Sequence, residues 1–165
     1  MTPIAADAAH FDDILALNAA SVQVLSPLTA QRLQQLHAAA AYHKVVVEDR
    51  RVVAFLLGFA PGADYDSVNY RWFDARHDDF LYVDRIVVAA SHRAHGLGAL
   101  LYQDFFAAAR ERGLAQVVCE FDIEPPNPAS AAFHRRFGFV EVGTQRTADG
   151  RKAVSLQSAP VAPLA

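Results

Sequence analysis

The sequence predicts a mixed α/β (α+β) domain, with a mostly antiparallel sheet and helices on both of its faces. The 165 residues are 53% hydrophobic and 20% charged, a composition typical of a globular chain long enough for a substantial core. Helical periodicity alternates with β-branched runs in the order helix, helix, hairpin, strand, helix, strand, helix, hairpin. The single strand–helix–strand unit should be parallel and right-handed, whereas the hairpins should be antiparallel, so the sheet should be mixed.

Two helices and a hairpin are expected before residue 60. Residues 7–21 have a helical stripe of apolar side chains, and Asp7 is a plausible N-cap. Residues 26–41 begin with Ser-Pro, which is typical of a cap followed by the first turn of a helix. Residues 44–60 contain two β-branched runs around a polar turn at residues 49–50, which predicts a hairpin.

A parallel strand–helix–strand unit is expected next. Residues 80–90 are apolar on both faces of a strand apart from Asp84 and Arg85, so this strand should be central in the sheet. A helix is predicted over residues 97–112, where leucines recur on one face, and a further strand over residues 115–121.

A short helix and a second hairpin complete the predicted fold. Asn127 followed by proline should open the helix, and Gly138 should close it. Residues 139–145 and 151–156 flank an Asp-Gly turn and should form the hairpin. We expect one domain over residues 1–157, followed by a C-terminal tail over residues 158–165.

Composition excludes several classes of partner. The net charge of −3 gives no support for binding to nucleic acid. The first residues, MTPIAADAAH, lack the basic and apolar segments of a secretory signal, and the longest apolar run, residues 52–60, is too short to span a membrane. Cys119 is the single cysteine, which rules out an intrachain disulfide. We therefore expect a cytoplasmic protein with no membrane or nucleic-acid partner.

The stretch RAHGLG, residues 93–98, lies where the helix over residues 97–112 should begin. A helix N-terminus has unpaired N–H groups and a partial positive charge, yet the first acidic residue after Arg93 is Asp104, two turns into the helix. Glycines let the backbone approach an anion closely. One interpretation is a tight turn and nothing more. The other is a phosphate or pyrophosphate site on the backbone amides of Arg93, Ala94, His95, Gly96, Leu97, Gly98 and Ala99, with the Arg93 side chain assisting.

Two other nucleotide motifs do not fit this stretch. The dinucleotide fingerprint requires glycine or alanine three residues after Gly98, where the chain has Leu101. The Walker loop requires Gly-Lys followed by Ser or Thr, and the sequence contains no such triplet.

The residues around this stretch resemble a known family. VVAASHRAHGLGALLYQDFFAAARERG is similar to the central motif of the GNAT acetyltransferase superfamily, in which Arg/Gln-x-x-Gly-x-Gly/Ala follows a strand-ending Val by five residues. NPASAAFHRRFGF resembles the later Asn-x-x-Ala/Ser…Gly-Phe segment of the family. The two segments cover about the central third of the chain, and the order of elements fits nearly all of it.

The resemblance implies an enzyme that moves an acetyl group from acetyl-CoA, or a related acyl-CoA, to an amine acceptor. The acceptor would be a small molecule or a peptide, and a homodimer is possible. The pyrophosphate would lie on residues 93–99, and the pantetheine arm would pair with the backbone of Val87 and Val88. Asn127 would touch the cofactor, although the same residue is equally well explained as a helix N-cap. A non-catalytic acyl-CoA sensor on the same fold is the alternative.

Direct transfer requires a base for the amine, and a proton for the leaving thiolate is favourable. Asp84 and Glu120 are the candidate bases, because each interrupts an apolar strand where desolvation raises the pKa of a carboxyl group. The alternatives are an ion pair between Asp84 and Arg85 or another basic group, and a Glu120 that points to solvent at the end of its strand.

His134 is the candidate acid. It occupies the position four residues before the glycine of Gly-Phe, where many relatives carry tyrosine. The alternative is a surface or phosphate-facing histidine, with Tyr82 and Tyr102 as other donors. Cys119 should be a buried structural thiol. His92 and His95 lack a third ligand nearby, so no metal site is expected.

Residues 61–79 are long for a connection between strands, which favours a function in acceptor binding. Their acidic side chains would attract a cationic amine. The candidate acceptor-binding residues are Tyr65, Tyr70 and Trp72, together with Asp84 from the following strand. The alternative is that the aromatic side chains pack this segment onto the body of the protein or onto a second copy.

Overall fold

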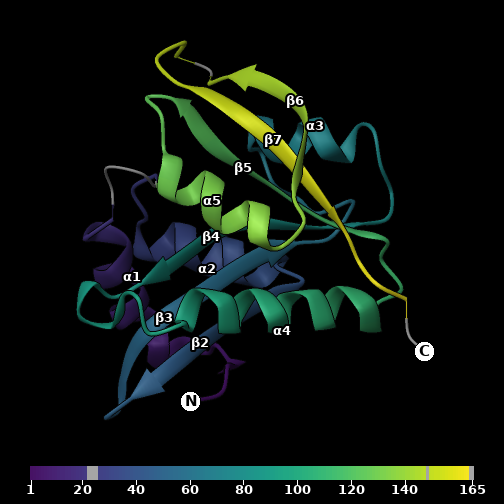
Figure 1. Cartoon of the computed structure of the whole chain (residues 1–165). Helices are drawn as coiled ribbons and strands as arrows, with labels where there is room; N and C mark the ends of the chain where they lie inside the picture. Colours follow the sequence, from purple (N-terminus) through teal and green to yellow (C-terminus); the bar gives the residue numbers. More distant parts are fainter. Residues whose placement is uncertain (22–25, 148, 164–165) are drawn as a thin grey trace. The chain divides into compact units, whose positions relative to one another are not determined.

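The computed structural model describes residues 1–21, 26–147 and 149–163, and it confirms the predicted fold class (Figure 1). In this part of the chain, seven strands are hydrogen-bonded in the order β1-β2-β3-β4-β5-β7-β6, in a mostly antiparallel sheet with β4 and β5 parallel. The strands are β1 (Ile4–Ala5), β2 (Tyr42–Glu48), β3 (Arg51–Phe59), β4 (Phe80–Val88), β5 (Gln116–Glu124), β6 (Val140–Arg146) and β7 (Ala153–Pro160). The helices are α1 (Phe11–Ala19), α2 (Ala30–Ala39), α3 (Val68–Asp74), α4 (Leu97–Glu111) and α5 (Pro128–Arg136), with 3₁₀ turns η1 (Ala8–His10) and η2 (Ala90–His92).

The chain divides into two compact units. The first comprises residues 1–59 and 84–108, and the second comprises residues 60–83 and 109–165. The expected single domain over residues 1–157 therefore stays a prediction. Strand β7 continues to Pro160, where it pairs with Gln116 of β5, so the sheet extends past the expected start of the tail at residue 158.

In the first unit, β2 and β3 form the predicted hairpin. Their register runs from Tyr42 opposite Gly58 to Glu48 opposite Arg51. The two turn residues, Asp49 and Arg50, have φ of 48° and 64°. Left-handed conformation at both central residues gives the turn a twist that matches paired strands, which explains why so short a polar turn suffices.

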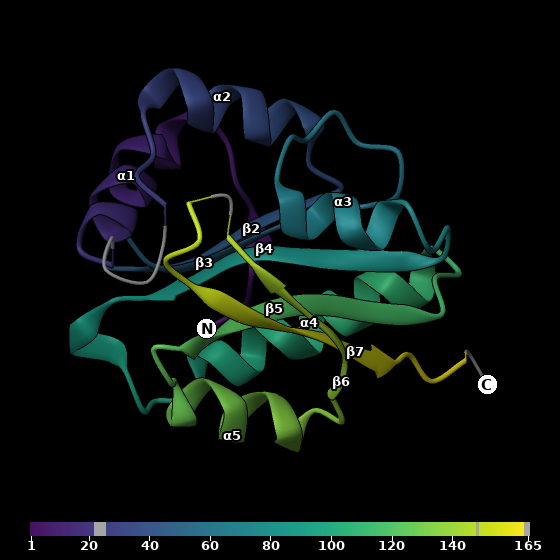
Figure 2. The same ribbon diagram turned by 90° about the horizontal axis from the view of Figure 1, so that it is seen from above.

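Alternate side chains of β2 pack against different helices of the first unit. Val45 belongs to an apolar cluster with Ile14 of α1 and Leu33 of α2, and Figure 2 shows these two helices on one face of β2 and β3. Tyr42 points the other way, with its ring centroid 4.8 Å from that of Phe105 in α4. The period of two along a strand thus distributes the helices over both faces of the hairpin.

The second unit repeats this arrangement around β5. Tyr82 of β4 lies with its ring centroid 5.4 Å from Tyr70 and 6.1 Å from Phe73, both in α3. On β5, Phe121 has its ring centroid 5.3 Å from that of His134 in α5. Figure 2 shows α3 and α5 on opposite faces of β5 and β7, in agreement with these contacts.

Side-chain caps define the starts of several helices. Asn127 accepts a hydrogen bond from the Ser130 N–H at 3.2 Å, which confirms the predicted start of α5. The predicted Ser26 cap is wrong, because Thr29 caps α2 and the Ser26 carbonyl accepts a hydrogen bond from the Asn18 amide instead. The first predicted helix consists of η1, capped by Asp7, and the shorter helix α1.

The long connection over residues 61–79 contains helix α3, which sequence patterning did not identify. Ser67 caps α3, and the side chains of Tyr70 and Phe73 form the buried side of this helix. Three closely spaced aromatic residues in a seven-residue helix obscure the helical period, and the cap is a single serine within a polar segment.

Candidate functional site

The turn between η2 and α4 is exposed and has an unusual backbone. Ala94 and Gly96 have φ of 64° and 79°, and the side chains of Arg93 and His95 are exposed. The first turn of α4 contains no acidic residue. A left-handed residue followed by right-handed helical residues turns successive N–H groups toward a common point, a geometry suited to anions.

The C-terminal side of this turn is anchored by the first residues of α4. Leu97 is buried, and the Leu100 N–H donates to the Gly96 carbonyl at 2.9 Å, which closes the first turn of α4. The helices α2, α3 and α5 instead begin with a Thr, Ser or Asn side chain that accepts a backbone N–H. The turn therefore has the exposure, charge and backbone that the predicted phosphate site needs, whereas the binding itself stays a prediction.

His92 precedes this turn and is held by neighbouring side chains. Its Nε2 lies 2.6 Å from Glu48 Oε2, and its Nδ1 lies 2.8 Å from Ser91 Oγ. The rings of His92 and His95 are 6.4 Å apart. Among the described residues, no group of three or more His, Cys, Asp or Glu side chains could hold a metal ion.

The end of β4 offers backbone groups in alternating directions. The Ala89 N–H donates to the Val53 carbonyl of β3 at 2.8 Å. Because alternate residues of a strand direct their backbone groups to the same edge, those of Val87 face β3 as well, and those of Val88 face the opposite edge. Val87 also packs with its side chain in the cluster around Ile14 and Phe55. Of the two residues predicted to pair with pantetheine, Val88 has the suitable backbone direction.

Asp84 forms the ion pair that was its alternative interpretation. Its Oδ2 lies 2.7 Å from Arg85 Nε, and the two side chains are only 5% and 7% exposed. Arg85 Nη1 also donates to Asn18 Oδ1 at 3.0 Å. A carboxylate held by a buried guanidinium has a structural role in the first unit. This contact therefore weighs against Asp84 as the base that deprotonates the acceptor amine.

Glu120 is held by a tyrosine from the adjacent strand. The Tyr82 hydroxyl donates to both oxygens of the Glu120 carboxylate, at 2.9 and 2.8 Å. Tyr82 is fully buried, and Glu120 is partly exposed. The parallel register places Tyr82 opposite Val118, so Glu120 follows two residues later on the same face of β5. Glu120 therefore combines a fixed orientation with access to solvent, which a general base requires.

His134 is buried rather than exposed, which contradicts its alternative interpretation as a surface histidine. It is 7% exposed, and the rings of Phe121, Phe133 and Phe139 lie 5.2–5.5 Å from its ring. Burial lowers the pKa of His134 below its usual value, and the hydrogen bond to the Ser130 carbonyl opposes this only in part. Nδ1 lies 2.7 Å from that carbonyl oxygen, which can only accept a hydrogen bond, so the proton on Nδ1 is directed to Ser130.

The aromatic residues of the 61–79 segment mainly pack within the second unit. Tyr70 is 1% exposed, and its hydroxyl donates to the Ala60 carbonyl and accepts from the Ala63 N–H. Trp72 lies against Gly143 of β6, where a Cβ atom would approach the indole to 2.8 Å, and the Arg76 guanidinium stacks on its ring. These contacts favour the packing interpretation for Tyr70 and Trp72. Tyr65 is partly exposed, with its ring 5.6 Å from that of Tyr70.

Two further candidate residues, Cys119 and Tyr102, are buried side chains. Cys119 is buried on β5, as expected of a structural thiol. Tyr102 is buried on α4 and is not exposed as a donor would be. Glu48 was not identified from the sequence, because 44 residues separate it from His92 and its only signal is its position at the end of a strand.

No described helix is both long and apolar enough to cross a membrane.

Known proteins resemble this chain in both sequence and fold. The family model for acetyltransferases of the GNAT family matches residues 12–139. The phosphinothricin N-acetyltransferase of Streptomyces coelicolor is 42% identical over 67 residues, which are 41% of this chain and 37% of that relative. The matched stretch thus spans well under half the length of the curated relative.

Two solved structures share the fold over almost the whole chain. The ribosomal-protein-alanine N-acetyltransferase of Brucella melitensis has a TM-score of 0.73 at 20% identity, over 97% of this chain and 99% of that chain. A putative phosphinothricin N-acetyltransferase has a TM-score of 0.74 at 17% identity, over 98% of both chains. At these identities the likeness shows the fold alone.

Proposed function

This chain belongs to the GNAT family of acetyltransferases, and from this premise we propose that it transfers an acetyl group from acetyl-CoA to an amine. The observation that carries the proposal is the exposed turn at residues 93–96. It combines two left-handed residues and an exposed arginine with a helix whose first turn lacks acidic residues. A pyrophosphate is the group that such a turn would stabilise.

Acetyl-CoA fits the residues of the first unit. When bound, it supplies a thioester whose carbonyl carbon accepts the amine. The amides of residues 93–99 hold the pyrophosphate, and the Arg93 guanidinium adds charge-assisted hydrogen bonds to its oxygens. The backbone of Val88 pairs with the pantetheine amide groups, because it faces away from β3. Asn127 belongs to the second unit, where it caps α5, and its contact with the cofactor stays a prediction.

In the second unit, Glu120 acts as the general base. It takes a proton from the acceptor ammonium, so that the neutral amine can attack the carbonyl carbon and the C–S bond can break. Tyr82 fixes the Glu120 carboxylate and acts as a positioning residue. Asp84 is a less suitable base because Arg85 already neutralises it.

His134 is not used as the acid in this mechanism. Burial lowers the pKa of His134 and so disfavours a second proton on the ring, and the proton on Nδ1 is directed to the Ser130 carbonyl and not to a thiolate. A thiolate is a stable leaving group with an ordinary pKa of about 8.5, so it can leave without an acid. The attacking nitrogen loses its second proton to solvent as the amide forms, and the thiolate takes up a proton from solvent, which balances the reaction.

The acceptor is a primary amine on a small molecule or a peptide. Phosphinothricin and the ribosomal-protein alanine are the acceptors that the names of the related proteins contain, and they represent these two classes. Tyr65 remains a candidate for acceptor contact because its side chain is partly exposed. The acidic side chains of Asp64 and Asp66 flank Tyr65 and would attract an ammonium group.

Release of free thiol from acetyl-CoA, with amines pooled by chemical class, tests this function. Thiol release in one pool is expected, and it would identify the acceptor class. If no pool gives release while acetyl-CoA still protects the protein from heat, a non-catalytic acyl-CoA sensor becomes the better explanation. If acetyl-CoA gives no protection either, the assignment of residues 93–99 to a pyrophosphate is wrong.

Replacing Gly96 by alanine should weaken acetyl-CoA binding. An L-residue in the left-handed conformation costs about 1–2 kcal/mol, and the turn can avoid this strain only by changing its backbone. Isothermal titration should therefore show a higher Kd for acetyl-CoA in Gly96→Ala. Gly113→Ala is the matched control, because Gly113 has a φ of 69° and open space around it but ends α4. An equal change of Kd in both variants would contradict the assignment.

A further inference from the structure

We propose that Glu48 is a positioning residue for the phosphate-binding turn, residues 93–96, and that it acts through His92. The inference rests on the proposed function, because it assigns a role toward the pyrophosphate of acetyl-CoA. It concerns a residue at the end of β2, which neither the sequence pattern nor the similarity to other acetyltransferases indicates.

The contacts of η2 form a continuous connection from the β2–β3 hairpin to this turn. The Ala89 N–H donates to the Val53 carbonyl of β3 at 2.8 Å, and the His92 N–H donates to the Ala89 carbonyl at 2.8 Å. These backbone contacts fix the start of η2. The imidazole of His92 is fixed separately, by Glu48 at 2.6 Å and by Ser91 at 2.8 Å. Glu48 therefore joins the hairpin to the last residue before the turn.

The backbone of the turn explains why such an anchor is needed. Ala94 is a non-glycine residue with a φ of 64°, a conformation that costs free energy for any residue with a Cβ atom. Strained conformations persist only where the surrounding structure holds the chain on both sides. On the C-terminal side, Leu97 is buried and α4 begins. On the N-terminal side, Arg93 is exposed, so the nearest anchored side chain is that of His92.

The charge of Glu48 is suited to this role and not to binding the anion itself. A carboxylate next to a pyrophosphate would repel it, yet here the carboxylate is directed to the imidazole. The ring is thereby held beside η2, and Arg93 and His95 remain the basic groups on the exposed turn. Removal of Glu48 should thus loosen the turn without removing a direct contact to the cofactor.

A second ion pair of the same hairpin provides a matched control. Arg51 follows Glu48 by three residues, and its Nη2 lies 2.7 Å from Oδ1 of Asp13 in α1. This pair connects the hairpin to α1 and not to η2. A variant at Arg51 therefore removes a comparable exposed ion pair of the hairpin while the contacts of His92 stay intact.

The test compares two acetyl donors in steady-state kinetics of Glu48→Ala, Glu48→Gln and Arg51→Ala. Acetyl-CoA carries the pyrophosphate, whereas S-acetylpantetheine lacks it. For Glu48→Ala we expect the KM for acetyl-CoA to rise about fivefold, the lower range of coupling between linked sites, with kcat little changed. The KM for S-acetylpantetheine should not change. Glu48→Gln should be intermediate, because its amide oxygen still accepts a hydrogen bond from His92, and Arg51→Ala should resemble the parent protein.

The outcomes separate the two proposals. An unchanged KM for acetyl-CoA in Glu48→Ala would overturn the role of Glu48 while leaving the proposed function intact. An equal rise for both donors would also overturn it, because a general structural loss affects them alike. If the parent protein shows no turnover and no heat protection by acetyl-CoA, the proposed function fails and the role of Glu48 fails with it.

Discussion

Replacing Glu120 by glutamine is expected to lower kcat about 100-fold or more, the usual range for removing a general base. The glutamine keeps the shape of the side chain and can still accept a hydrogen bond from the Tyr82 hydroxyl, so the strand pairing should be preserved. It cannot accept a proton from the acceptor ammonium. The loss should therefore appear in kcat, measured by thiol release with saturating acetyl-CoA, while the Kd for acetyl-CoA stays unchanged.

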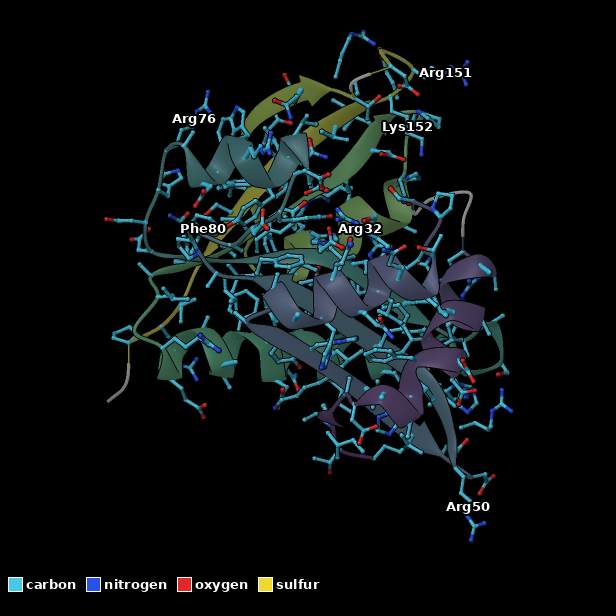
Figure 3. The ribbon with its side chains drawn as sticks, turned by 180° about the vertical axis from the view of Figure 1, so that it is seen from behind. Arg32, Arg50, Arg76, Phe80, Arg151 and Lys152 are labelled. Carbon is cyan, nitrogen blue, oxygen red and sulfur yellow. The ribbon has the colours of Figure 1, made fainter. Side chains whose placement is uncertain are left out.

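Asp122 gives the matched control for this substitution. It is the next acidic residue of β5 on the same face, and it pairs with Lys152 at 3.4 Å near the start of β7, where Figure 3 labels Lys152. Asp122→Asn should leave kcat near its normal value. Tyr82→Phe should give a smaller loss than Glu120→Gln, because it removes only the orientation of the base. A normal kcat in Glu120→Gln with a large loss in Asp84→Asn would transfer the role of base to Asp84.

Acidification from pH 6.5 to pH 4 is expected to lower the free energy of unfolding by about 3 kcal/mol through His43 alone. A difference of one unit between the pKa values of the folded and unfolded chain corresponds to about 1.36 kcal/mol. Burial, together with the nearby His37 and His10, lowers the pKa of His43 from 6.5 to about 4. The unfolded chain therefore binds this proton at a higher pH than the folded chain. The stabilisation is complete above pH 6.5, and it is lost as the pH falls toward 4.

The surroundings of His43 give the physical reason for this shift. The side chain is 8% exposed, and its Nδ1 lies 2.8 Å from Nδ1 of His37, so one proton is shared between the two rings. Its buried Nε2 has no hydrogen-bond partner among the residues that the structure describes. Phe11 and Phe55 pack around the ring, and Phe11 also contacts His37. A second proton would place a positive charge on a buried ring that packs against Phe11, His37 and Phe55.

Urea unfolding at pH 7 and pH 4.5 measures this contribution in the parent protein and in His43→Phe. The variant keeps an aromatic ring in the cluster but cannot be protonated, so its stability should fall less over the same pH interval. His77→Gln is the control, since His77 is exposed. Equal acid sensitivity of the parent protein and His43→Phe would show that His43 does not carry this effect.

The sequence by itself determined the features that depend on residues close together in the chain. The turns at residues 49–50 and 149–150, the start of α5 at Asn127, and the glycine-rich turn before α4 were all predicted at the correct place. Each of these depends on a local backbone preference, so a few adjacent residues suffice. The same local signal connected the turn at residues 93–98 with a phosphate. The Ser-Pro signal at residues 26–27 misplaced the start of α2, which Thr29 caps instead.

Only the tertiary structure decided which candidate side chains are held by partners. Glu120 and Tyr82 are 38 residues apart and meet because β4 and β5 pair in parallel, while Glu48 and His92 meet across 44 residues. The burial of His134 depends on three phenylalanine rings from β5, α5 and the residue that follows Gly138. Periodicity tells which face of an element is apolar, but not which polar group lies opposite. The charge state and accessibility of a titratable side chain depend on that opposite group, so the choice between Asp84 and Glu120 required the fold.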